Sequence, residues 1–308
     1  MLFNFSKQDL LSSSRLHDYM DQNDERRKVI IGHSPDPDDA FMFHALTNEK
    51  FPTGNIEYQH QLMDIESLNA LAKEESLEVS AVSIHAYPEI AHNYALMNCG
   101  ASMGEGYGPM IVSKKNISLE EVKSNAIAIP GIKTSAFLAL RLCWGDFQYQ
   151  VVPFDEIIPR IVSGEFTSGL IIHEGQLTYK DSDLDVHLNL GKWWNEITGG
   201  LPLPLGGNVV KKSLGKEMVE QITKDTKKSI QYALEHPGEA LEFAKKWGRG
   251  IDDATNEEFV SMYVNQRTIS YGEDGRESIR LFISMGQEIG LISDDFDVSS
   301  IEFVGAEV

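Results

Sequence analysis

Three aspartates follow an apolar run within four residues of SPDPDDAF: Asp36, Asp38 and Asp39. Clustered carboxylates can bind a metal, transfer protons, or accept hydrogen bonds from the free amides at a helix start. A calcium loop beginning at Asp36 would need Gly at its sixth position and Glu at its twelfth, but Phe41 and Thr47 stand there. Pro37 suits the first turn of a helix. We therefore interpret the acids mainly as a helix start and predict no metal site.

Two histidines at the ends of apolar runs are candidates for proton transfer. His173 ends the run in GLIIHE, and a histidine facing a cleft can act as a general base because its pKa lies near neutral pH. His85, in VSIHAY, shares a predicted strand face with Ser83 and could reach the same cleft, or it could simply be packed or exposed. The sequence has no GxSxG or HExxH motif beside them, so it supports neither a serine hydrolase nor a zinc protease.

The stretch IPGIKTSAF places Thr134 and Ser135 at the start of an apolar helical pattern, next to Lys133. Hydroxyls and free amides at a helix N-terminus suit a carboxylate or phosphate. The same residues would also make an ordinary helix cap, and the segment alone does not separate the two functions. The glycines of GEGYGP, including Gly108, allow backbone to approach a ligand. No helix follows them, so they are not a dinucleotide fingerprint.

Short apolar runs alternate with amphipathic ones along the chain. The pattern predicts strands at 28–34, 55–63, 78–85, 126–131, 149–154, 168–173 and 184–190, and helices at 38–48, 65–75, 134–144 and 155–163. This order is typical of an α/β protein with a mostly parallel sheet. A glycine- and proline-rich return is expected near 200–208, followed by helices at 217–234, 237–247, 256–263 and 276–289.

The alternation of strands and helices occurs twice, at 28–85 and at 126–173. Two α/β units of this kind indicate two lobes that face each other across a cleft. We expect residues 28–112 with 206–308 to form one lobe and residues 113–205 the other, after a loosely attached polar leader at 1–27. Ligands of open α/β sheets bind outside the carboxyl ends of the strands. The polar residues that follow the strands are therefore the candidates for the site.

The charge and composition exclude several classes of partner. The chain has 27 basic and 47 acidic residues, and its only basic cluster is at 26–28. Nucleic acids and anionic membranes need a basic surface, so neither is expected as a partner. Cys99 and Cys143 have no metal-binding spacing and suit a core. No export signal or apolar run of about 18 residues occurs, so we expect a cytoplasmic protein.

Several blocks, taken in order, resemble the 1,4-dihydroxy-6-naphthoate synthases of the futalosine route to menaquinone. They are SPDPDDAFMFHAL, DIESLNALA, VSIHAY, GYGPMIVS, IAIPGIKTSAFLALRL, GLIIHE, LNLGKWWNEITGGLPLPLGGNVV and MYVNQRTISYGEDGRESI. The resemblance implies the two-lobed fold of type 2 periplasmic binding proteins. It also implies a lyase that uses no metal or organic cofactor and acts on a small carboxylate-bearing substrate, cyclic dehypoxanthine futalosine.

The resemblance assigns site residues as well. It makes His173 the base and places an acid group of the ligand at Thr134, Ser135 and the amide of Ala136. Other positions of the matching blocks are expected to bind substrate: Ser34, Asp38, Asp39, Ser83, His85, Gly108, Glu174 and Gly207.

One block departs from the family pattern. The family reads Ser-Pro-Cys-Pro-Asn-Asp-Thr-Phe where this chain has Asp36 for Cys, Asp38 for Asn and Ala40 for Thr. Three alternatives therefore stand beside the synthase: a divergent paralogue with another substrate, a non-catalytic intracellular carboxylate binder, and the related chorismate dehydratase. The GLIIHE and WW blocks argue against the dehydratase.

Overall fold

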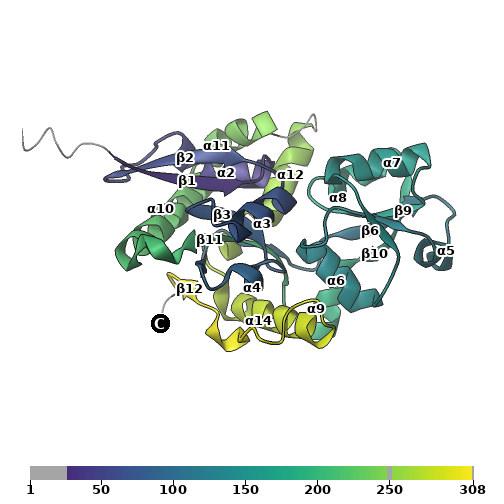
Figure 1. Cartoon of the computed structure of the whole chain (residues 1–308). Helices are drawn as coiled ribbons and strands as arrows, with labels where there is room; N and C mark the ends of the chain where they lie inside the picture. The colour runs from purple at the N-terminus through teal and green to yellow at the C-terminus, as the bar shows by residue number, and fades with distance from the viewer. Residues whose placement is uncertain (1–25, 248–251, 307–308) are drawn as a thin grey trace, which may run out of the picture.

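A computed structural model describes residues 26–247 and 252–306. The strands form two sheets that lie beside one another, each with helices on its faces (Figure 1). The large sheet has the order β12-β4-β11-β3-β1-β2, with β5 also paired to β11. Its strands are β1 (Arg27–His33), β2 (Ile56–Leu62), β3 (Val79–Ser83), β4 (Tyr94–Met97), β5 (Ser102–Gly104), β11 (Leu203–Lys211) and β12 (Phe303–Val304).

The small sheet has the order β10-β6-β9-β7-β8. Its strands are β6 (Met110–Lys114), β7 (Ile127–Ile129), β8 (Tyr149–Val151), β9 (Ser168–Ile171) and β10 (Leu184–Asn189). Strands β7, β8 and β9 pair in parallel, while β6 pairs antiparallel to β9 and β10. The predicted α/β class is confirmed, and both sheets are mixed.

The return predicted near 200–208 is wrong for most of that stretch, which forms strand β11 from Leu203 onward. It pairs antiparallel with β3, β4 and β5 in the middle of the large sheet. Proline is normally absent from central strands because it cannot donate a backbone hydrogen bond to a neighbouring strand. Here the register shifts between Pro204 and Gly206, so the proline lies at a bulge. Val209 and Val210 are fully buried beyond it, as a central strand requires.

Helix α2 (Pro37–Thr47) is buried on every side from Pro37 to Leu46. It packs on β2 and on three helices of the large-sheet side: α10 (Lys216–Glu235), α11 (Pro237–Ala244) and α12 (Asp253–Tyr263). The remaining helices there are α3 (Ile65–Lys73), α4 (Tyr87–Ile90), α13 (Gln266–Ile269) and α14 (Gly272–Glu288). The acids at the start of α2 are therefore enclosed by protein.

A shared core joins the two sheets. Helices α6 (Ser135–Trp144) and α9 (Leu190–Thr198) pack with α14 beneath both sheets (Figure 1). Trp194 of α9 is fully buried, and its indole Nε1–H donates to Ser278 Oγ of α14 at 2.9 Å. The small sheet also carries α5 (Leu119–Ser124), α7 (Ile157–Ser163) and α8 (Gly175–Thr178). This core fixes the space between the sheets, where the polar strand ends meet.

The leader predicted at 1–27 lies outside the described residues except for its last two, and Arg27 is the first residue of β1. Among the described helices, none is long and apolar enough to cross a membrane.

Candidate active site

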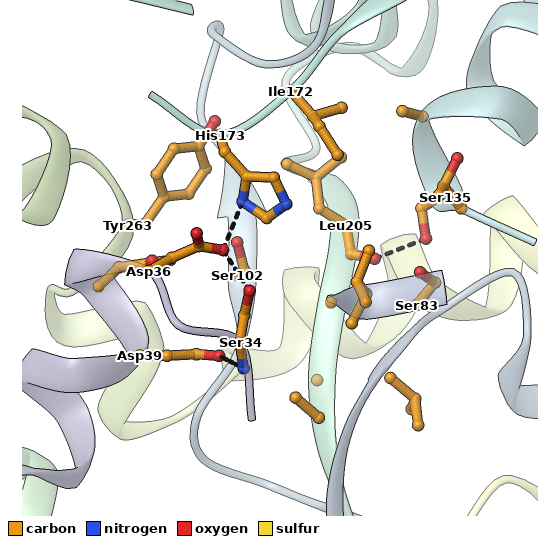
Figure 2. A pocket seen from close by; sticks show the side chains of 18 of the residues that line it. Ser34, Asp36, Asp39, Ser83, Ser102, Ser135, Ile172, His173, Leu205 and Tyr263 are labelled. Carbon is orange, nitrogen blue, oxygen red and sulfur yellow. Dashed lines mark hydrogen bonds and ion pairs between the residues drawn. The ribbon is translucent and has the colours of Figure 1, made fainter. Parts of the chain in front are cut away.

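A cavity lies between the two sheets, and residues from both line it (Figure 2). The large-sheet side contributes Ser34, Asp36, Asp38 and Asp39 from the turn between β1 and α2, with Ser83, Ser102, Gly207 and Asn208 from neighbouring strands. The small-sheet side contributes Thr134, Ser135 and Ala136 at the start of α6, and Ile172, His173 and Gln176 after β9. The polar strand ends of both units thus face one space, as the strand-end rule predicts.

His173 and Asp36 form an ion pair across this cavity. Asp36 Oδ2 lies 2.9 Å from His173 Nδ1. The same oxygen accepts a hydrogen bond from Ser34 Oγ (Figure 2). The helix-cap interpretation of Asp36 is wrong in this respect: α2 does start at Pro37, but the Asp36 side chain makes no capping hydrogen bond. Its charge is directed at the histidine of the other sheet instead.

The backbone of His173 is in the left-handed region, with φ at 52°. The predicted strand ends earlier, at Ile171, so His173 belongs to a turn before α8. Non-glycine residues adopt this conformation at a cost, and such residues concentrate at functional sites. The turn directs the ring toward the large sheet, and the ring also contacts Phe154 with a centroid distance of 4.8 Å.

The electrostatics of the site follow from burying several charges together. Burial alone would lower the pKa of His173, but the charge and hydrogen bond of Asp36, helped by Glu174 and Asp38, raise that pKa to about 9. Burial and the charge of Asp36 raise the pKa of Asp38 to about 7. Burial, Asp38 and Asp36 raise the pKa of Asp39 well above its usual value. The imidazolium is thus the favoured form of His173 at neutral pH.

At the start of α6, the hydroxyl groups already have protein partners. Thr134 Oγ1 accepts from Phe137 N at 3.2 Å and donates to Gly131 O at 2.8 Å, so Thr134 is an N-cap. Ser135 Oγ donates to Leu205 O at 2.5 Å. The first helical hydrogen bond runs from Leu138 N to Thr134 O. The amides of Ser135 and Ala136 precede it and are suited to hold an anion.

Most residues expected to bind substrate line the cavity: Ser34, Asp38, Asp39, Ser83, Thr134, Ser135, Ala136 and Gly207, together with the expected base His173. Gly207 can offer a ligand only its backbone, since it has no side chain. A larger residue would not fit there, because an added Cβ would lie 2.6 Å from Tyr271 Oη in the core.

Three expected residues lie outside the lining. His85 is buried, its Nδ1 lies 3.2 Å from Thr134 O, and burial lowers its pKa to about 4. Gly108 packs against the backbone of Gly191 at the start of α9. Glu174 precedes α8, where its charge acts on His173. None of these three is among the residues that line the cavity.

Four further lining residues were not singled out from the sequence: Ser102, Gln176, Asn208 and Tyr263. Tyr263 Oη of α12 donates to Gln176 Oε1 of α8 at 2.8 Å. This bond joins the two sides of the cavity, as do the Asp36–His173 pair and the bond from Ser135 Oγ to Leu205 O. Asn208 and Tyr263 lie in blocks that resemble the family. Nothing in the sequence marks any of the four as lining a cavity, because that depends on the packing of distant elements. Within the described ranges, no three His, Cys, Asp or Glu side chains are placed to hold a metal ion.

A family model described as "Menaquinone biosynthesis" matches residues 29–288. A protein of Thermus thermophilus named 1,4-dihydroxy-6-naphthoate synthase is 33% identical over 261 residues, covering 85% of this chain and 94% of the relative. A Streptomyces coelicolor protein of the same name is 30% identical over 268 residues, with the same coverage.

Solved structures agree with this family match. A protein of Archaeoglobus fulgidus is 41% identical, has a TM-score of 0.82, and covers 86% of this chain and 98% of its own. An alkanesulfonate-binding protein from Xanthomonas axonopodis has a TM-score of 0.66 at 11% identity, covering 90% of this chain and 98% of its own. The second likeness concerns the fold alone, and it confirms the predicted periplasmic-binding-protein-like architecture.

Proposed function

Because the chain belongs to the menaquinone biosynthesis family, we propose that it is a lyase that converts cyclic dehypoxanthine futalosine to 1,4-dihydroxy-6-naphthoate. The observation that carries the proposal within the site is the placement of His173. His173 lines a cavity between the two sheets, and Ser135 and Ala136, in the first turn of α6, line the same cavity. This placement supports a base and an anion site that share one small-molecule space.

In the proposed reaction, His173 removes a proton from the bound substrate and thereby starts its fragmentation. The sugar part leaves, and formation of the aromatic naphthoate drives the reaction. The base is the neutral form of the imidazole, so the reaction needs His173 to be deprotonated before it acts. The enclosing residues exclude water from the reacting atoms. This role uses only side chains of the chain itself.

The carboxylate of the substrate is proposed to bind at the start of α6. The amides of Ser135 and Ala136 supply donors there, and the helix dipole favours a negative charge. We further infer that residues 28–112 with 206–308 and residues 113–205 act as the two lobes around this ligand, and that the enzyme works in the cytoplasm.

Incubation of the protein with cyclic dehypoxanthine futalosine, followed by chromatography, tests the function. We expect the naphthoate to appear at a rate proportional to enzyme concentration. A Thermus thermophilus relative assayed in parallel controls for the substrate preparation. If the relative turns over and this chain gives no product while still binding the substrate by calorimetry, the chain is a binding protein of the same fold.

The proposed carboxylate site can be tested with Ser135→Pro. Proline fits the first position of a helix, and Thr134 before it has the extended backbone (φ −70°, ψ 145°) that proline requires. The substitution removes one amide donor, so we expect KM to rise about 10-fold, the value of one charge-assisted hydrogen bond.

Ser135→Ala is the matched control for this test. It loses the Ser135 hydroxyl, which donates to Leu205 O and accepts from His85 N, but keeps the backbone amide. The predicted result is a clearly smaller rise in KM than for Ser135→Pro. Equal KM values for the two variants would remove this amide from the proposed site.

A further inference from the structure

We propose that Asp36 is a positioning residue for His173: its carboxylate holds the Nδ1–H of the ring so that Nε2 faces the cavity as the proton-accepting atom. The inference rests on the proposed role of His173 as the base. It adds to that role a residue from the opposite sheet, at a position where the resembling family carries a cysteine.

The geometry fixes which nitrogen can act. Asp36 Oδ2 lies 2.9 Å from His173 Nδ1, and an ionised carboxylate can only accept a hydrogen bond. The proton of the neutral ring is therefore on Nδ1, and the lone pair is on Nε2. Nε2 is buried and has no hydrogen-bond partner among the described residues. Figure 2 shows this nitrogen turned away from Asp36, toward the side of the cavity where Leu205 and Ser135 lie.

The carboxylate is itself held in place. Asp36 is 1% exposed, and Ser34 Oγ donates to the oxygen that faces His173. The backbone N–H of Ser34 donates to Asp39 Oδ2 at 2.7 Å, which fixes the turn that carries Ser34. A side chain whose rotamer is locked in this way can orient its partner without losing further conformational entropy.

The groups around His173 favour its charged form. The titratable side chains near the ring come from α2 and the residue before it, from the turn before α8, and from α12: Asp36, Asp38, Asp39, Glu174 and Tyr263. Asp36 makes the largest of the contributions that raise the pKa of His173 to about 9, against the opposing effect of burial. Since catalysis needs the neutral ring, turnover in the wild type should rise with pH through about 9. Removing the Asp36 charge should shift that rise to lower pH.

The test compares Asp36→Asn with Asp36→Ala. Asparagine keeps the shape and a carbonyl that can accept from Nδ1–H but removes the charge, whereas alanine removes both. We expect the ascending limb of kcat/KM, which reports the free enzyme, to move down by about one pH unit or more in both variants. A weaker base lowers kcat on the pH plateau by about 10-fold for Asp36→Asn, and by more for Asp36→Ala, with little change in KM.

Asp64→Asn is the matched control, because Asp64 is an exposed cap of α3 and asparagine caps equally well. Its pH profile should coincide with that of the wild type. Thermal unfolding of all variants shows whether any loss of activity is a loss of fold.

A second measurement needs no turnover. Nitrogen-15 NMR of the histidine rings in the unliganded protein reports the tautomer and the titration midpoint, with His173→Asn assigning the signal. We expect a neutral His173 protonated at Nδ1 in the wild type, and a lower midpoint in Asp36→Asn. Identical tautomer and midpoint in both proteins, or coincident pH profiles, would overturn the role of Asp36. Absence of product from the wild type would instead overturn the proposed function, while the NMR titration would still decide the positioning role.

Discussion

Replacing His173 with asparagine is expected to lower kcat by on the order of 10²- to 10⁴-fold, the range contributed by a general base. Asparagine tolerates the left-handed backbone that His173 adopts, with φ at 52°, better than most residues, so the turn should survive. Its amide can still donate to Asp36, but it cannot accept a proton at neutral pH. Binding should persist, because the amides of α6 are untouched. Steady-state kinetics, with calorimetry of substrate binding, measures both quantities.

His187→Asn is the matched control for this substitution. His187 also lies on the small-sheet side, in β10, where Nε2 lies 2.7 Å from Ser113 Oγ, and it does not line the cavity. Its kcat should equal that of the wild type. If His173→Asn retains most of the wild-type turnover on the pH plateau, another group is the base.

Gly191→Ala is expected to destabilise the protein by about 3 kcal/mol, the upper part of the range for overpacking. An added Cβ would lie 1.8 Å from Tyr107 O and 2.9 Å from Gly108 N, and these atoms belong to the backbone. The backbone cannot yield as a flexible side chain can, so α9 and the loop at 105–109 must separate. The separation would also weaken the bond from Leu190 N to Pro109 O, now 2.9 Å.

The measurement is thermal or urea unfolding. A loss of this size should lower the midpoint of thermal unfolding by about 5 °C or more. Gly238→Ala is the control, since nothing lies within 4 Å of its added Cβ in α11. Alanine there should be neutral or slightly stabilising because it favours helix. Equal midpoints for both variants would mean that glycine is not needed at position 191 for close packing.

Local patterns predicted the elements well where periodicity was strong. The predicted helices at 134–144 and 217–234 correspond to α6 (Ser135–Trp144) and α10 (Lys216–Glu235). Strand β11 was missed because its prolines and glycines are typical of a loop. Only the register shift beside β5 makes Pro204 compatible with a strand.

The three aspartates show the same limit at the site. Their sequence context indicated a helix start, and α2 begins there. Capping is a local property, so it could be judged from neighbouring residues. The partner of Asp36 is His173, which comes from the other sheet. No spacing in the sequence indicates that the two side chains meet.

The sequence by itself determined the family, the α/β class, the candidate base His173 and the helix start at Thr134, because each depends on residue type and local pattern. The tertiary structure decided the pairs that cross the cavity, Asp36 with His173 and Tyr263 with Gln176. The physical reason is that hydrogen bonds need donor and acceptor within about 3 Å. Such distances depend on how a core shared by α6, α9 and α14 sets one sheet against the other.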